Sequence, residues 1–479
     1  MNARPWRAAA LFLAATAPLC PNNAYSIEFP YNIADPLRTV PDVMEKGVTL
    51  PGDSTPIPRA ARKDFTQPLT LAEAVDLALS NNREVKWAWA EIKVQAGALG
   101  EAYAAYLPVI SGSASWTNDT IDYSDSQKSS TYTNSTTVQA SASWRIFDFG
   151  GRSAGRKSSE NLLAAALAGY NATLQDVLAK VIRAYFDATT AGASVTAKTK
   201  DEEVAQGTLH SAIKREAMGA VSQSDTLRAM TALARAALDK SRALGEYQKS
   251  VAVLRHYLGL PGAAELLLPS ELHEHQGGVI AVKELSIWLE EARLHPTLIA
   301  ARKQLDAAQE QVVVARSSGL PVVSLAAHYY QNTRPGEAVN QGAQETMLTA
   351  TLSIPFFEGF ATTYKLRGAQ AQVEKKAAAL ADTEQQVAMG VIKAHADADA
   401  ALRNLEASAT LLESARSSLA VSQRKYNKGA ADITEVLSTQ AALADAWNER
   451  VRCLAEWHSS RLQLLASTGK LGRYALENK

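Results

Sequence analysis

The side chains best suited to chemistry are few and widely spaced in this chain of 479 residues. Its eight histidines are scattered, and the closest pair, His273 and His275, lies in a polar stretch. An H-x-H pair can bind a metal ion, but the sequence favours an ordinary surface loop here. The chain contains no P-loop and no G-x-G-x-x-G motif, which mark nucleotide-binding proteins. We therefore expect no enzyme, and no catalytic, cofactor-binding or metal-binding residues.

The first 26 residues have the pattern of a secretory signal peptide. Arg4 and Arg7 provide the positive start, residues 8–19 are apolar, and Ala24-Tyr25-Ser26 offers small residues for cleavage. This apolar run is shorter than the roughly 20 residues that a membrane-spanning helix needs. We therefore expect export and cleavage rather than a membrane anchor.

The two cysteines provide no disulfide framework. Cys20 follows the apolar run and raises the question of lipidation, but Pro18 and Leu19 stand where lipoprotein signals carry small residues. The sequence therefore favours a chain without a lipid anchor. Cys453 lies in a helical pattern and is expected to be a small buried apolar residue.

Charge and composition exclude some partners and favour long helices. Lys and Arg number 49, as do Asp and Glu, so there is no electrostatic reason to expect nucleic acid or an anionic surface as partner. Hydrophobic residues make up 47%, much of it alanine, and aromatic residues only 7%, which suits closely packed helices. After the signal peptide, no segment approaches 18 consecutive apolar residues. This leaves a soluble protein outside the cytoplasm or a membrane β-barrel, whose strands give a weak hydropathy signal.

The chain contains one pattern twice. Residues 181–188, VIRAYFDA, return 210 positions later as residues 391–398, VIKAHADA. This period is far longer than the roughly 20–50 residues of solenoid repeats, so each copy is expected to be a whole structural unit. Other pairs follow the same shift or one of 213: Gly219 and Gly429, Gly259 and Gly469, Leu107-Pro108 and Leu320-Pro321. We divide the chain into a signal peptide (1–26), an extended proline-rich arm (27–68), repeat 1 (69–262), a linker (263–281), repeat 2 (282–472) and a short tail (473–479).

Repeat 1 is expected to contain a helix, two strands, a long helix, a break and a last helix. Thr70 and Glu73 form a capping box, and the helix that follows runs to about Tyr106, with an interruption near Asn81-Asn82. The period then changes to two over strands at about 109–118 and 136–146. Helical character from about 153 to 218 breaks at Gly219 and resumes to about 258. Apolar residues along the long helix have nearly heptad spacing: Leu163, Leu167, Tyr170, Leu174, Val177, Val181 and Tyr185.

Repeat 2 is expected to repeat this order. A helix over residues 282–318 precedes strands at about 322–330 and 346–355, and a long helix from about 361 to 427 breaks at Gly429. A helix of about 65 residues would be roughly 100 Å long, which no compact domain needs.

The strand pairs fit a membrane barrel. Their length of about ten residues, with one apolar and one Ser/Thr face, suits outer-membrane strands, although a soluble half-buried sheet fits the alternation equally well. Export favours the membrane, as do Trp116 and Trp144 near strand ends. Four strands cannot close a barrel, and an open edge in lipid leaves backbone groups unpaired. We therefore expect a mixed α and β fold in which three chains form a 12-stranded barrel and a periplasmic coiled-coil tube of helices.

The order of these elements resembles the TolC-like outer membrane efflux family, over about residues 66–472. Residues 69–82 resemble its opening helix, and residues 147–151 and 355–359 its strand-to-helix turns, with Asp148, Gly150, Glu358 and Gly359. Residues 425–429, followed by Glu435-Val436-Leu437 and Gln440, resemble its helix-break signature. The resemblance implies a homotrimeric duct that does no chemistry, located in the outer membrane with a periplasmic extension. It also implies two partners, a periplasmic adaptor protein and an inner-membrane transporter, either an ABC transporter or a proton-driven pump.

The resemblance also implies roles for single residues. The helix breaks would contact the adaptor: Met218, Gly219, Ala220, Lys428, Gly429 and Ala430. At the periplasmic gate, Tyr426 matches the family's tyrosine, Asp225 the acidic residue of the first repeat, and Glu435 the first inner acidic ring. Three Glu435 side chains around one lumen would attract cations and repel anions. A solvated helix face is the plain alternative for each of these residues.

Two gate positions depart from the family. Ala431 stands where the family has an arginine, and Ser438 stands at the second acidic position. The closed state therefore cannot use the family's arginine–aspartate bridge, and the carboxylate ring would be thinner.

The main alternative is a soluble periplasmic coiled-coil adaptor or structural protein. The four strands argue against it, because an adaptor does not need them. The cargo stays open between proteins exported by type I secretion and small molecules such as drugs or metal ions, because the resemblance places selection in the transporter.

Overall fold

The computed structural model describes residues 35–42, 44, 49–51, 53, 67–122, 131–219, 222–262, 266–269, 284–333, 343–428 and 430–472. The predicted signal peptide, most of the proline-rich arm and linker, and the tail lie outside the described residues. So do Ala220 and Gly429 at the helix breaks, the His273–His275 pair, and Cys20.

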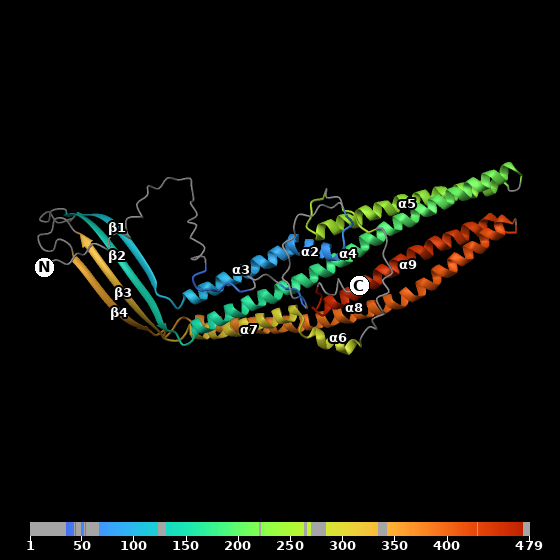
Figure 1. The fold of residues 1–479 in the computed structure, drawn as a ribbon. Helices are drawn as coiled ribbons and strands as arrows, with labels where there is room; N and C mark the ends of the chain where they lie inside the picture. The colour runs from blue at the N-terminus through green and yellow to red at the C-terminus, as the bar shows by residue number, and fades with distance from the viewer. Residues whose placement is uncertain are drawn as a thin grey trace.

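The molecule is long and narrow, with a sheet at one end and pairs of long helices at the other (Figure 1). In repeat 1, the helices α2 (Leu71–Asn81) and α3 (Arg83–Ala104) precede the strands β1 (Val109–Ile121) and β2 (Thr131–Phe147), which lead into the long helix α4 (Gly151–Ala217) and its partner α5 (Gln223–Tyr257). In repeat 2, the helices α6 (Leu285–Ala292) and α7 (Pro296–Ser317) precede the strands β3 (Val322–Thr333) and β4 (Ala343–Ser353), which lead into the long helix α8 (Ala361–Asn427) and its partner α9 (Ile433–Ser467).

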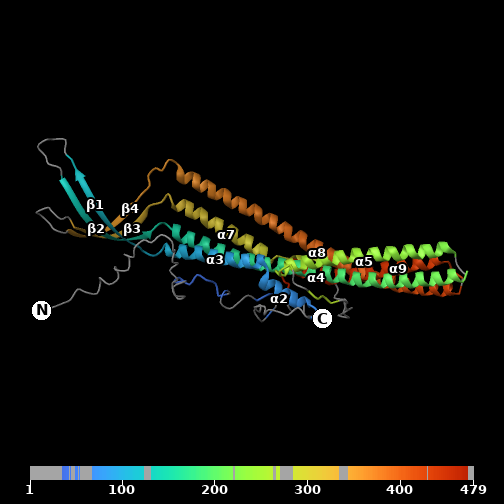
Figure 2. The same cartoon turned by 90° about the horizontal axis from the view of Figure 1, so that it is seen from above.

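The two long helices have equal lengths, as the duplication predicts. Each of α4 and α8 has 67 residues and each of α5 and α9 has 35. At 1.5 Å per residue the long helices extend for about 100 Å. Both helical pairs run to the same end of the molecule, opposite the sheet (Figure 1 and Figure 2). Within the described residues, no helix is apolar over a stretch long enough to cross a bilayer.

The heptad seam predicted for α4 is confirmed. Six of its seven residues are buried, and Leu167 is half-buried against the same core. This core lies at the middle of the molecule, where α2 and α3 pack on α4. The C-terminal parts of α5 and α9 also contribute buried residues to it. Cys453 is also buried, as expected, and burial raises the pKa of its thiol.

The four strands form one antiparallel sheet in the order β1-β2-β3-β4, so β1 and β4 are its edges. In the first hairpin Val109 pairs with Ser143, and in the second Val322 pairs with Ser353. These pairs differ by 213 residues on the first strand and 210 on the second, which are the two shifts seen in the sequence. All four strands extend beyond their predicted bounds on the side of the loops, because the pairing continues through the polar residues there. At its other end, β4 stops two residues earlier than predicted.

Equivalent junctions hold the helices of both repeats at mid-length. Thr70 and Glu73 form the predicted capping box of α2, and Asn82 caps α3 by accepting from the backbone N–H of Glu84 at 2.7 Å. His295, 213 positions later, caps α7 in the same way, with Nδ1 accepting from the N–H of Thr297 at 3.2 Å. Burial lowers the pKa of His295, which keeps the ring neutral and able to accept.

One predicted element is divided. The helix expected over 282–318 consists of α6 and α7, which are separated by Arg293, Leu294 and His295. Pro296 is the reason, because a residue that precedes proline is disfavoured in helical geometry and proline suits the first turn of a new helix.

Candidate functional site

The two helix breaks lie together at the end of the molecule farthest from the sheet (Figure 1). Gly219 ends α4 with φ +71°, a left-handed conformation that favours glycine, and its N–H donates to the carbonyl of Glu216 at 2.8 Å. Met218 beside it is 74% exposed. At the second break Lys428 is exposed, and the N–H of Ala430 donates to the carbonyl of Lys425 at 2.9 Å. Both turns therefore present a short exposed segment at the tip.

A small apolar cluster joins the two breaks. Ala212 on α4, Ala229 on α5 and Tyr426 on α8 are buried in it, together with Leu419, Ile433 and Val436. Ala431 packs against this cluster, half-buried. Ala431 is therefore part of this apolar contact, and the breaks of both repeats share one core.

Tyr426 is held by an arginine of the other repeat. The guanidinium of Arg215 on α4 lies 4.3 Å from the centre of the Tyr426 ring, a distance suited to a cation–π interaction. The same guanidinium donates through Nη1 to the backbone carbonyl of Tyr426 at 3.2 Å. No pattern in the sequence indicates this pair, because its members are 211 positions apart.

Glu435 lies on the first turn of α9 and is exposed. Its carboxylate accepts from the hydroxyl of Ser422 at 3.2 Å and lies 3.7 Å from the ammonium of Lys425. Ser438 is exposed one turn later, and its hydroxyl donates to the backbone carbonyl of Glu435. Ser438 thus binds the backbone and leaves the carboxylate to Ser422 and Lys425.

Asp225 occupies the matching place on the first turn of α5 and is half-buried. Arg228 lies 3.8 Å from its carboxylate and also donates to the hydroxyl of Thr434 on α9 at 3.2 Å. Asp225 and Glu435 therefore lie at equivalent helix starts. The partner of Asp225 is an arginine of its own helix, whereas the partners of Glu435 are a serine and a lysine of α8.

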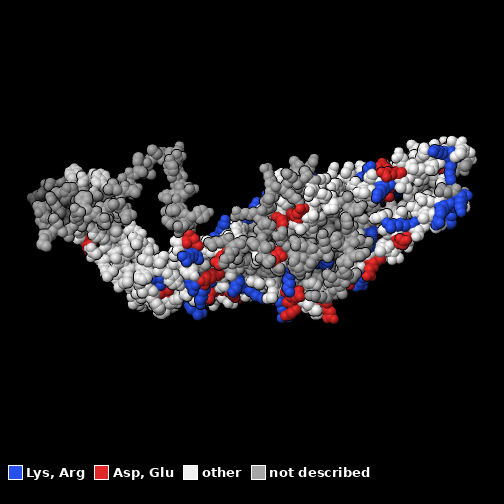
Figure 3. Space-filling model, in the orientation of Figure 1, with Lys and Arg blue, Asp and Glu red and all other residues white. Residues whose placement is uncertain are grey.

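The tip carries an excess of exposed cationic side chains. Figure 3 shows Lys and Arg gathered at the ends of both helical pairs. The exposed cations in the last turns of α4 and α8 and just beyond are Lys214, Arg424, Lys425 and Lys428. This places a positive surface around the breaks.

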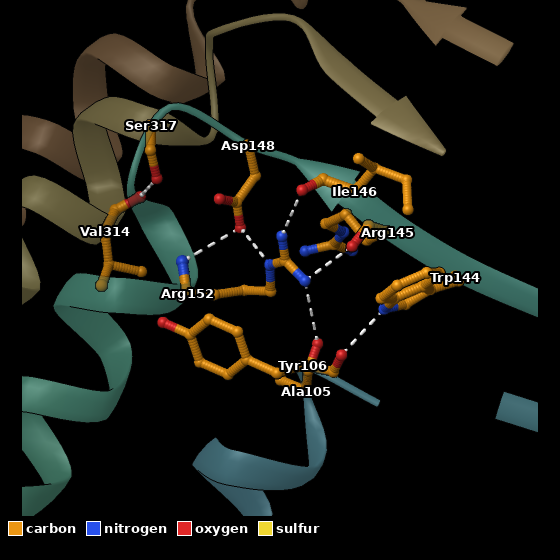
Figure 4. Close-up of polar contacts among 9 residues, drawn as sticks. All are labelled: Ala105, Tyr106, Trp144, Arg145, Ile146, Asp148, Arg152, Val314 and Ser317. Atoms are coloured by element: carbon orange, nitrogen blue, oxygen red, sulfur yellow. Dashed lines mark hydrogen bonds and ion pairs between the residues drawn. The ribbon is translucent and has the colours of Figure 1, made fainter. Parts of the chain in front are cut away.

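The strand-to-helix turn of repeat 1 is built around an arginine that the sequence did not indicate. Figure 4 shows Arg152 among residues that directly follow α3 and the last residues of β2. Its guanidinium forms an ion pair with Asp148 at 3.0 Å, and both side chains are 11% exposed. It donates to the carbonyls of Arg145 at 2.6 Å and Ile146 at 3.0 Å. It also lies over the Tyr106 ring, at 5.0 Å from the ring centre.

The equivalent turn of repeat 2 lacks this arginine. Thr362 takes its place 210 positions later and donates to the carboxylate of Glu358 at 2.7 Å. Gly150 and Gly359 both have positive φ, as their places in the turns require. Four aromatic side chains are exposed at the second turn: Phe356, Phe357, Phe360 and Tyr364.

An internally duplicated chain with paired helices of about 100 Å and a small open sheet at one end has the architecture of an outer-membrane export channel. The chain belongs to the outer membrane efflux protein family, whose model matches residues 74–260 and 288–470. Protein CyaE of Bordetella pertussis (strain Tohama I) is 33% identical over 90% of each chain.

Solved channels share the fold at low sequence identity. The CmeC outer membrane channel of Campylobacter jejuni has a TM-score of 0.72 at 18% identity, over 90% of this chain and 99% of that one. The outer membrane protein VceC of Vibrio cholerae has a TM-score of 0.71 at 18% identity, over 83% of this chain and 96% of that one. The protein is therefore an outer-membrane exit duct for efflux or secretion and not an enzyme. This excludes the alternative of a soluble adaptor.

Proposed function

We propose that three copies of this chain form one duct, with a 12-stranded barrel above a periplasmic tube of helices. The duct takes cargo from an inner-membrane transporter through a periplasmic adaptor protein. The observation that carries this proposal is the open four-stranded sheet at the end of the long helices, because no further described strand pairs with its edges β1 and β4. Unpaired strand edges in lipid cost several kcal/mol per backbone group, and pairing with further copies removes them.

The duplication suggests how one copy joins the next. Within the chain, β2 pairs with β3, for example Ser143 with Ala326. Adding 210 to the first residue and subtracting 213 from the second gives Ser353 on β4 and Ser113 on β1 of a neighbouring copy. The two hairpins already obey these shifts, so the same geometry repeated between chains would close the sheet.

The exposed aromatic residues at the second turn fit the same arrangement. Tyr364 is 67% exposed, whereas Ala154, its counterpart in repeat 1, is 3% exposed and lies on α4, which packs against α7. A neighbouring copy that places its α3 beside α8, as α7 lies beside α4, would cover Tyr364 and the phenylalanines around it. Burial of such large rings contributes about 2 kcal/mol each.

Cysteine cross-linking tests this register. We expect Ser353→Cys with Ser113→Cys to form disulfides between chains under mild oxidation, seen as dimers and trimers on a non-reducing gel. The matched control, Ser143→Cys with Ala326→Cys, has the equivalent geometry within one chain and should oxidise without change in size. Ser353→Cys with Thr117→Cys is four residues out of register. Equal cross-linking of that pair, or none of the in-register pair while the control oxidises, would contradict the proposal.

At the other end, we propose that the tip residues form the entrance and its gate. Glu435 would face the lumen, with Tyr426, Asp225, Ser438 and Ala431 around it. The breaks at Met218-Gly219-Ala220 and Lys428-Gly429-Ala430 would contact the adaptor. The exposure of Met218, Gly219, Lys428 and Ala430 and the positive surface around them support this role.

The charge of Glu435 tests this arrangement. In planar bilayers the purified protein should give discrete conductance steps that favour cations, and Glu435→Ala should reduce the cation preference because one carboxylate per chain is lost from the ring. Glu435→Asp keeps the charge and should keep the preference. Removing the nearby cation with Lys425→Ala should raise it. Unchanged selectivity in Glu435→Ala would remove this residue from the lumen, whereas the absence of any conductance from the wild type would contradict the channel itself.

A further inference from the structure

Polar contacts at the tip link the helical pair α4–α5 to the helical pair α8–α9. Arg215 reaches from α4 to Tyr426 on α8, and Arg228 reaches from α5 to Thr434 on α9. A weaker contact joins Thr208 and Gln440 at 3.5 Å. Of these contacts, the one made by Arg215 has two partners on Tyr426, the aromatic ring and the backbone carbonyl. Arg215 is also half-buried, whereas Arg228 is exposed.

We propose that Arg215 is the residue that latches the two helical pairs together at the entrance, in place of the arginine absent at position 431. This proposal rests on the proposed gate, because it assigns the contact that keeps that gate closed. The guanidinium stacks on the ring face of Tyr426 and donates a hydrogen bond to its backbone carbonyl. The latch therefore acts on the last turn of α8, directly before the second break.

The hydroxyl of Tyr426 takes no part in this latch. Its oxygen is buried and has no hydrogen-bond partner among the described residues. Because its own chain already buries it, a neighbouring copy has no surface of this oxygen to contact. The contact with Arg215 therefore uses the ring face and the main chain of this residue.

The geometry separates this latch from a general charge effect. Lys214 precedes Arg215 in the same last turn of α4, but it is exposed on another side of the helix. Neutralising Lys214 changes the charge of the tip by the same amount as neutralising Arg215 and leaves the contact with Tyr426 in place. It is therefore the matched control.

Two measurements on the full-length protein in detergent or bilayers test the latch. In hydrogen exchange, Arg215→Ala should raise the opening of the last turn of α8 by about tenfold, since a charge-assisted contact is lost. Lys214→Ala and Tyr426→Phe should leave it unchanged, and Arg215→Lys should give an intermediate value. In planar bilayers Arg215→Ala and Tyr426→Leu should give larger conductance steps than the wild type, and Tyr426→Phe should not.

The outcomes separate the latch from the channel. If Tyr426→Phe opens the tip as much as Arg215→Ala does, the hydroxyl is functional and the proposal is wrong. Exchange in Arg215→Ala that matches the wild type also overturns it. If exchange rises as expected but conductance does not change, the contact exists without controlling the entrance, and the latch is overturned while the channel stands. A wild type without conductance contradicts the proposed function, and the exchange data then still decide the contact.

Discussion

Replacing Arg152 by alanine is expected to lower the free energy of unfolding by about 3 kcal/mol, because it leaves the nearly buried carboxylate of Asp148 without its cation. The same change removes donors from two carbonyls at the end of β2 and the cation over the Tyr106 ring. The junction between the sheet and α4 depends on these contacts, which join the ends of α3 and β2 to the first turn of α4 (Figure 4). We therefore expect less protein in the outer membrane as well as lower stability.

Thermal unfolding of the detergent-solubilised protein, followed by circular dichroism, measures this effect. Arg156→Ala is the matched control, because Arg156 lies one turn later on α4 and pairs with Glu160 at a more exposed position. Such exposed pairs contribute about 0–1 kcal/mol, so Arg156→Ala should shift the midpoint little. Equal shifts in both variants would show that the Arg152 contacts do not hold the junction. Asp148→Asn, which keeps an acceptor for Arg152, should fall between them.

The overall architecture could be predicted because it follows from local patterns. The seam on α4, the capping box of Thr70 and Glu73 and the change of period at Leu107-Pro108 each depend on neighbours in sequence. The duplication extends further, since the shifts of 210 and 213 reproduce the strand pairing of the second hairpin from the first. The division between α6 and α7 was also encoded locally, in Pro296, and was missed.

The polar contacts of the site could not be predicted in this way. Arg152 binds mainly backbone carbonyls, which every residue has, so its acceptors leave no mark in the sequence. Arg215 and Tyr426 are distant in the chain and in different repeats. The internal comparison also misleads here, because Thr362 stands in repeat 2 where Arg152 stands in repeat 1, so the two copies carry different residues at equivalent positions. Only the folded chain brings such partners together.

Replacing Gly259 by alanine is the second change with a large expected effect, a loss of about 3 kcal/mol, which combines left-handed strain with a backbone clash. Gly259 has φ +66°, and a Cβ there would meet the carbonyl oxygen of Asn81 at 2.7 Å. The close approach exists because the end of α5 docks on the α2–α3 junction, where Asn82 donates from its side chain to the carbonyl of Tyr257 at 2.9 Å. A backbone atom cannot rotate away, so one of the two helix ends must move.

Gly219→Ala separates the two contributions. Gly219 has a similar φ of +71°, but a Cβ there meets nothing within 4 Å, so only the strain of about 1 kcal/mol applies. Gly469, the counterpart of Gly259, has φ +75° and a Cβ there would meet Cδ of Pro296 at 2.5 Å. Gly469→Ala should therefore resemble Gly259→Ala in its unfolding midpoint. If Gly259→Ala lowers the unfolding midpoint no more than Gly219→Ala does, the mid-length junctions can accommodate a methyl group and the predicted clash is wrong.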